Sequence, residues 1–140
     1  MAFTQDYSTA LAGLVVIVST WMLQWLIASR TKASQPGAIP GKIDENLSHE
    51  SFVYRSHRTF HNSQENLPMM MATSFLALFL GANPQWVGYL IWTFAIARIL
   101  HMALYYKIAT EKNPSPRTLL FAIGFFANVA LIGLCIGAAF

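Results

Sequence analysis

The chain has 140 residues, of which 55% are hydrophobic and only 11% are charged, and its formal net charge is +3. Soluble domains carry about 25% charged residues, so this composition excludes an ordinary soluble domain and favours an integral membrane protein. The basic balance does not predict a nucleic-acid partner, because neither a clustered basic surface nor a recognition motif accompanies it.

The first expected element is a membrane-spanning helix over residues 9–28, an uninterrupted apolar run that ends before Arg30 and Lys32. Its length matches the roughly 20 residues that cross ~30 Å of hydrocarbon. Because no Lys or Arg precedes Arg30, the run lacks the basic region of a cleaved signal peptide, and we expect it in the mature protein. A linker rich in proline and glycine follows over residues 33–47.

A second, longer helix is expected over residues 48–80, with Ser48 or Asn46 as its cap. At 1.5 Å per residue it measures about 50 Å, which is longer than a bilayer is thick. Its first turns should therefore project into water, and residues 66–80 should cross the membrane. Pro68 removes one backbone donor, so a kink is expected just after Glu65.

Two further spans complete the expected fold. After a tight turn at residues 81–84, the hydropathy predicts a third span over residues 86–106 and a fourth over residues 117–139. The lone cysteine, Cys135, excludes an intrachain disulfide. The sequence predicts one all-α membrane domain over residues 1–140, a bundle of four transmembrane helices.

The basic residues are distributed unevenly among the loops. The N-terminus, the turn at residues 81–84 and the C-terminus carry none, and within the spans only Arg98 is basic. The positive-inside rule therefore places both termini on the non-cytoplasmic side and the two long loops in the cytoplasm. The eight other basic residues lie at these two loops: Arg30, Lys32, Lys42, Arg55, Arg58, Lys107, Lys112 and Arg117.

Two polar stripes are expected to face each other near the cytoplasmic surface. On the third helix Arg98, His101 and Tyr105 share a face at the spacing i, i+3, i+7. Opposed stripes would line one cleft suited to a small ligand with both signs of charge, because arginines bind carboxylates and a carboxylate binds an ammonium. At 100° per residue, one stripe of the second helix contains Arg55, Arg58, Asn62, Glu65 and Met69.

Other interpretations of these residues stay open. The two arginines of the second helix could sit at the headgroups while Glu65 pairs with Arg98 for structural reasons. His57, His61 and Glu65, spaced i, i+4, i+8, could begin a metal site, although ligands on one helix rarely complete one, and we expect no metal. Haem between His61 and His101 is a weaker alternative. A small four-helix exporter would need an acidic residue in the first span, and that span has none.

The ordered motifs resemble those of the MAPEG family, the membrane-associated proteins in eicosanoid and glutathione metabolism. The pattern R-x-x-x-N-x-x-E-N-x-P covers residues 58–68, and A-R-x-x-H-x-x-x-Y covers residues 97–105 after a G-x-N-P turn. The likeness extends over about residues 9–139. It implies a homotrimer in a lipid bilayer, with glutathione as cofactor bound between neighbouring subunits near the cytoplasmic face.

The resemblance also implies roles for individual residues. Arg117 matches the arginine that stabilises the cofactor thiolate, and we expect Tyr105 to donate a hydrogen bond beside it, so these two are the catalytic candidates. Thr118 stands where some members have serine. The positions that match the glutathione pocket are Arg30, Arg55, Arg58, His61, Asn62, Glu65, Arg98, His101, Tyr105 and Thr118.

Departures from the eicosanoid synthases favour a general detoxification enzyme. His61 stands where the prostaglandin E synthase branch has arginine, Phe60 replaces a polar residue, and the spacing from Tyr105 to Arg117 is longer. The expected function is that of a membrane-bound glutathione transferase or peroxidase, similar to the microsomal transferases, that acts on lipophilic electrophiles or hydroperoxides. A non-catalytic lipid-binding helper of the same fold is the alternative.

Overall fold

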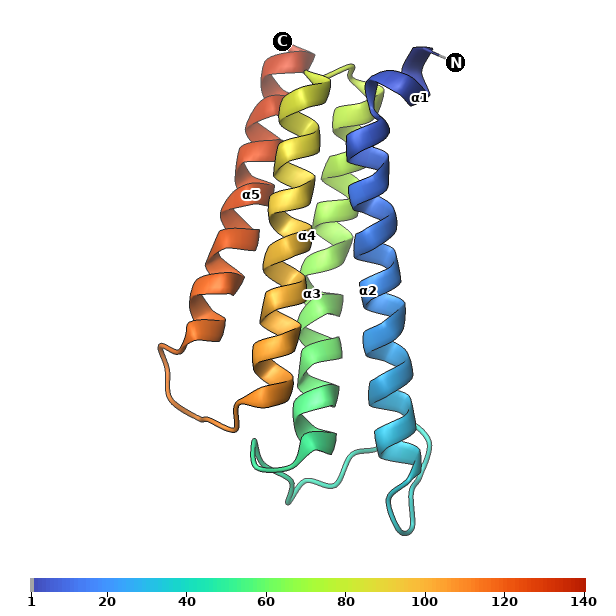
Figure 1. The fold of residues 1–140 in the computed structure, drawn as a ribbon, viewed down its shortest axis with the longest axis vertical. Coiled ribbons are helices and arrows are strands. Elements are labelled where there is room, and N and C mark those ends of the chain that lie inside the picture. Colours follow the sequence, from blue (N-terminus) through green and yellow to red (C-terminus); the bar gives the residue numbers. More distant parts are fainter. Residues whose placement is uncertain (1) are drawn as a thin grey trace.

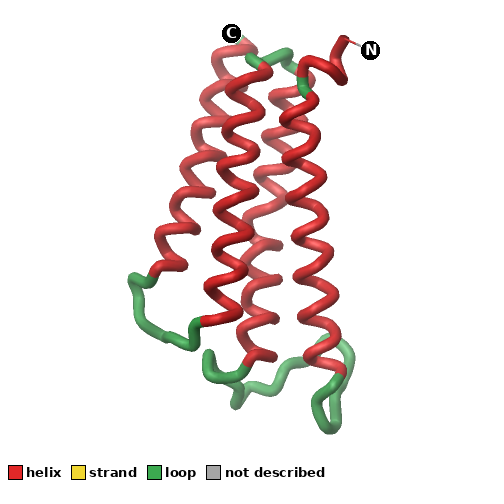
Figure 2. Tube along the Cα trace, in the orientation of Figure 1, coloured by secondary structure: helices red, strands yellow, loops and turns green. Residues whose placement is uncertain are grey.

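The computed structural model describes residues 2–140, and every regular element within that range is a helix (Figures 1 and 2). Four long helices run side by side, with both chain ends at one end of the bundle and the two long loops at the other (Figure 1). The all-helical prediction is confirmed. The helices are α1 (Ala2–Asp6), α2 (Ser8–Ala33), α3 (Phe52–Phe79), α4 (Pro84–Lys107) and α5 (Pro116–Ala139).

Three of these helices, α2, α4 and α5, are long and apolar enough to cross a membrane. They indicate a multi-pass membrane protein. Helix α3 is equally long but carries polar and charged side chains along its first half, from Arg55 to Asn66. The polar stripe therefore lowers the apolarity of α3, and a fourth membrane crossing through α3 stays a prediction.

The helix bounds differ from the sequence expectation mainly around the first loop. Helix α2 continues five residues beyond Ala28, because hydropathy marks the hydrocarbon layer rather than the helix end. Helix α3 begins at Phe52 rather than Ser48, because Ser51 has extended backbone angles (φ −78°, ψ 129°) and acts as the N-cap. It then continues as one helix through Pro68 to Phe79. His49 consequently lies in the loop and not in a helix.

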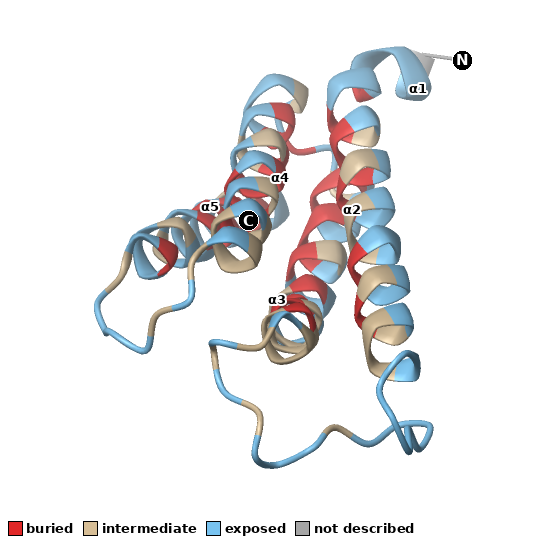
Figure 3. Ribbon diagram, turned by 60° about the horizontal axis from the view of Figure 1, so that its bottom comes forward, coloured by how far each residue is buried: buried red, intermediate tan, exposed pale blue. Residues whose placement is uncertain are grey.

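Helix α4, like α3, contacts each of the three other long helices. Its start is well defined, since Pro84 occupies the first turn and the Asn83 side chain accepts hydrogen bonds from the backbone N–H groups of Gln85 and Trp86. The buried residues lie on the helix faces that point into the bundle, and the exposed residues lie on the outward faces (Figure 3). The exposed outer residues are largely apolar, as expected for contact with lipid.

Close packing of α2 against α4 depends on Gly13. A Cβ atom added there would lie 2.7 Å from Cγ2 of the fully buried Ile91, a branched side chain with little room to move. We expect Gly13→Ala to lower the free energy of unfolding by about 1–3 kcal/mol through overpacking. Thermal unfolding in one detergent would measure this, with Gly133→Ala as control because nothing lies within 4 Å of its added Cβ. Equal stability of both variants would contradict the packing argument.

Candidate functional site

A cleft of about 370 Å³ opens at the loop end of the bundle, between α3, α4 and α5. This volume falls within the range of about 300–1,000 Å³ typical of small-molecule sites. The segments around it come from distant parts of the sequence and are brought together by helix packing. Its lining includes His49, Arg58, Asn62, His101, Tyr105, Thr110, Glu111, Lys112, Ser115, Arg117, Thr118 and Phe121.

Three buried polar atoms from three different helices lack a hydrogen-bond partner at this cleft. They are Oδ1 of Asn62 on α3, Nδ1 of His101 on α4 and Nη1 of Arg117 on α5. An unpartnered buried polar atom costs roughly 1–3 kcal/mol, and native proteins keep few of them. All three residues line one cleft, so a polar ligand bound there could supply the missing partners.

Arg117 and Tyr105 stack on each other in the cleft. The guanidinium carbon of Arg117 lies 4.1 Å from the centroid of the Tyr105 ring, which places the cation over the aromatic face. Its Nη2 donates a 2.6 Å hydrogen bond to the backbone oxygen of Thr110. Arg117 is only 7% exposed, so its remaining donor, Nη1, is held rigidly in a partly dehydrated place.

The start of α5 explains how Arg117 reaches the cleft. Pro116 occupies the first turn, and the backbone N–H of Ser115 donates to Oγ1 of Thr118 at 3.1 Å. These features fix the first turn of the helix and therefore the direction of the Arg117 side chain. Thr118 lines the cleft as the sequence expected, but its oxygen also takes part in this helix cap.

The cleft brings together six of the residues named from the sequence and leaves five elsewhere. Arg30 and Glu65 are exposed, His61 packs against His57, and Arg98 is buried with Nη2 donating to Oγ of Ser63 at 2.9 Å. The six in the lining are Arg58, Asn62, His101, Tyr105, Arg117 and Thr118. The five outside it are Arg30, Arg55, His61, Glu65 and Arg98.

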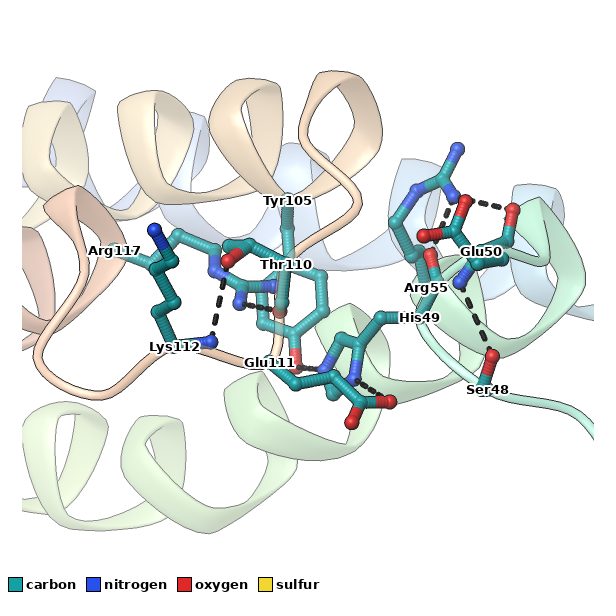
Figure 4. A network of polar contacts seen from close by, with 9 residues as sticks. All are labelled: Ser48, His49, Glu50, Arg55, Tyr105, Thr110, Glu111, Lys112 and Arg117. Carbon is teal, nitrogen blue, oxygen red and sulfur yellow. Dashed lines mark hydrogen bonds and ion pairs between the residues drawn. The ribbon is translucent and has the colours of Figure 1, made fainter.

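Arg55 holds the loop beside the cleft rather than lining it. Its Nη1 donates to the backbone oxygens of His49 at 2.6 Å and Glu50 at 2.8 Å (Figure 4). We expect Arg55→Met to release this turn, so that the amide protons of residues 49–51 exchange with solvent at least tenfold faster, about 1.4 kcal/mol of lost protection. Hydrogen exchange with mass spectrometry measures this, and Lys42→Met in the preceding loop is the control. Unchanged exchange would contradict the anchoring role.

His49 and Glu111 belong to the site although the sequence did not single them out. His49 Nε2 lies 3.1 Å from the Tyr105 hydroxyl, and His49 Nδ1 lies 3.6 Å from Oε1 of Glu111. Both residues come from loops without a periodic pattern, and the contact with Tyr105 joins residues 56 positions apart. Nothing local in the sequence indicates either contact.

The metal alternative depends on His57 and His61, whose ring centroids are 4.1 Å apart. Within residues 2–140 no group of three or more His, Cys, Asp or Glu side chains converges as metal ligands need. Glu65, the expected third ligand, is exposed and lies one helical turn beyond His61. The other alternative is a structural pair between Glu65 and Arg98, and within residues 2–140 no ion pair joins these two side chains.

The charge of the cleft favours an anionic ligand. Arg58, Lys112 and Arg117 contribute three cations to the lining, and Glu111 contributes one carboxylate. Because Arg58 and Arg117 come from facing helices, a ligand between them would meet guanidinium groups on two sides. Guanidinium groups bind carboxylates and thiolates through charge-assisted hydrogen bonds.

Comparison with known proteins supports one assignment. Neither the search of curated proteins nor that of solved structures gave a match. The model of the MAPEG family matches residues 7–137, nearly the whole chain, and this range includes every element of the cleft. The chain therefore belongs to the MAPEG family.

Proposed function

We propose that the protein is a membrane-bound glutathione transferase with an accompanying peroxidase activity, and that the cleft binds glutathione and holds its thiol as thiolate. Membership of the MAPEG family indicates a role in glutathione-related or eicosanoid metabolism. The observation that supports the finer assignment is the convergence of Asn62 Oδ1, His101 Nδ1 and Arg117 Nη1, all buried and unpartnered, in a cationic cleft.

Glutathione carries groups that can bond to the side chains of the cleft lining. Its two carboxylates suit the guanidinium of Arg58, its peptide N–H groups can donate to Oδ1 of Asn62, and its sulfur suits Nη1 of Arg117. A cysteine-like thiol has a pKa near 8.5 and is mostly protonated at neutral pH, whereas the nucleophile is the thiolate. Lowering that pKa by about two units takes roughly 2.7 kcal/mol, which one well-placed guanidinium in a dehydrated cleft can supply.

The second substrate would arrive from the lipid. Phe121 lines the cleft on α5 and is 37% exposed, and the exposed Phe125 follows it at i+4 on the same side of the helix. An apolar halide, epoxide, enone or hydroperoxide dissolved in the bilayer could therefore reach the sulfur without crossing water. The thiolate would displace halide from a carbon, open an epoxide to an alkoxide, or add to an enone to give an enolate, and the resulting anion would take up a proton where it remains on the product. With a hydroperoxide it would attack the terminal oxygen and release an alkoxide, and a second glutathione would convert the sulfenic acid to glutathione disulfide and water.

The same proposal includes a homotrimer of four-span subunits with both termini on the non-cytoplasmic side and the cleft near the cytoplasm. Glu65 is exposed on α3, in the region expected near the membrane, where a carboxylate facing lipid costs roughly 2.5–3.5 kcal/mol. A neighbouring copy that covers α3 would remove this cost. Arg30, exposed at the loop end of α2, would then be available to the cleft of that neighbour.

Two assays of the detergent-solubilised protein test the proposed activity. One measures conjugation of glutathione to a chlorinated nitrobenzene, and the other measures glutathione-dependent reduction of a lipid hydroperoxide. We expect both rates to saturate with glutathione. Saturable glutathione binding without turnover on any electrophile would instead favour the non-catalytic lipid-binding helper, and absence of binding would refute the cofactor assignment.

A further inference from the structure

His49 lines the cleft and lies between Tyr105 and the exposed Glu111. Its Nε2 atom is 3.1 Å from the hydroxyl of Tyr105, and its Nδ1 atom is 3.6 Å from Oε1 of Glu111 (Figure 4). The side chain of His49 is 20% exposed and that of Glu111 is 72% exposed. The three groups thus form a sequence that begins at the half-buried Tyr105 and ends at a carboxylate in water.

The orientation of the imidazole is fixed by more than the Tyr105 contact. The ring of Tyr54 packs edge-on against it with 5.0 Å between centroids, and the backbone oxygen of His49 accepts the hydrogen bond from Arg55. A carboxylate near Nδ1 favours the tautomer that carries its proton there, which leaves the Nε2 lone pair free to accept from Tyr105. Two ring nitrogens with different partners are what a proton relay requires.

We propose that His49, through Tyr105, removes the proton that glutathione loses when its thiol ionises, and that Glu111 passes this proton to solvent. The proposal rests on the proposed function, since it presumes that glutathione binds in the cleft and ionises there. His49 touches neither the sulfur nor the second substrate. It is a positioning residue that acts through Tyr105.

The transfer conserves atoms and charge. The S–H bond of glutathione breaks, sulfur keeps the electron pair, and the proton bonds to the Tyr105 oxygen while the Tyr105 proton moves to His49 Nε2. His49 then gives its Nδ1 proton to the Glu111 carboxylate, and water takes it from there. Tyr105 ends as the donor to the thiolate, so its expected role and its contact with His49 are compatible.

The charged groups around the relay are known from the structure. The cations are Arg58, Lys112 and Arg117 in the cleft lining and Arg55 on α3, and the carboxylate that faces His49 is Glu111. At 3.6 Å the contact of His49 with Glu111 is electrostatic rather than a hydrogen bond. One bridging water, or a rotation of the exposed Glu111 side chain, completes the path.

Rapid mixing of the solubilised protein with glutathione tests the relay. The ultraviolet absorbance of the thiolate and the colour of a pH indicator report ionisation and proton release in one experiment. We expect His49→Ala to slow both signals by roughly 10²-fold, the lower range for positioned acid–base groups, with little change in the dissociation constant of glutathione. Added imidazole should restore much of the rate to His49→Ala, an effect that repair of packing alone would not give.

Two further variants make the result decisive. Glu111→Gln changes an exposed side chain and should slow proton release without altering the fold, whereas His57→Gln, outside the cleft, should behave as wild type. An unchanged ionisation rate in both His49→Ala and Glu111→Gln, with wild type forming thiolate, would overturn the relay and leave the proposed function intact. Failure of the wild type itself to form thiolate would overturn both.

Discussion

Arg117→Ala should lower kcat/KM for glutathione conjugation by about 10²–10³-fold, the cost of removing one preorganised donor from a developing anion. Nη1 of Arg117 is buried without a partner, while Nη2 is held by Thr110 and the guanidinium lies over the Tyr105 ring. Such a rigid donor needs no reorganisation when the thiol ionises. The variant should therefore lose thiolate absorbance at neutral pH as well as turnover.

The variant Arg117→Lys tests whether a positive charge at this position is enough or whether the planar guanidinium group is also needed. Lysine keeps the positive charge but cannot hold Thr110 and the sulfur with one planar fork, so we expect activity between wild type and the alanine variant. Lys107→Ala is the matched control, since Lys107 is exposed in the last turn of α4 and does not line the cleft. Full turnover in Arg117→Ala would remove this residue from the mechanism.

Arg58→Ala should raise the dissociation constant of glutathione about ten- to a hundredfold. Arg58 is half-buried in the cleft lining, and a hydrogen bond to a charged group contributes roughly 1.5–3 kcal/mol. Because a carboxylate contact is made equally in ground and transition state, KM should rise more than kcat falls. Isothermal titration calorimetry and steady-state kinetics together measure this division.

A modified ligand identifies the partner of Arg58. Glutathione esterified at one carboxylate should bind wild type more weakly, but it should lose little further affinity for Arg58→Ala if the esterified carboxylate is the one that Arg58 holds. If, for each of the two single esters, the loss of affinity from esterification simply adds to the loss from Arg58→Ala, the contact between Arg58 and a carboxylate is contradicted. Arg55→Ala is not a suitable control, because Arg55 holds the backbone of His49.

Part of the cleft followed from helical spacing alone. Arg58 and Asn62, at i and i+4 on α3, and His101 and Tyr105, at i and i+4 on α4, all line it. Neighbours at this spacing share one face at nearly the same depth, so the prediction needed only the helix period. Hydropathy likewise located α2, α4 and α5, because a bilayer demands long apolar runs.

Position along the helix axis explains why some of the expected site residues do not line the cleft. Glu65 lies within about 20° of Arg58 on the helical wheel, but seven residues further along it is displaced by about 10 Å. A helical-wheel projection gives the angle of each residue but not its distance along the axis. It therefore groups Glu65 with the residues that line the cleft. Arg98 is likewise seven residues, or about 10 Å, from Tyr105 along α4, and it is buried against Ser63 instead.

Loop residues could not have been found from the sequence. His49, Thr110 and Glu111 meet Tyr105 and Arg117 only because α3, α4 and α5 bring two loops to the same end of the bundle (Figures 1 and 4). Their segments have no apolar periodicity, and the candidate caps at Ser48 and Asn46 made residues 48–51 part of the expected helix. The error arose because the cap at Ser51 depends on backbone angles that composition does not specify.

The most direct test of thiolate stabilisation in the cleft is a titration of the detergent-solubilised protein with glutathione at neutral pH, followed by thiolate absorbance. The account predicts a saturable rise that S-methylglutathione, which has no ionisable thiol, does not produce. Saturable binding of glutathione in the calorimeter with no thiolate absorbance at neutral pH would contradict it.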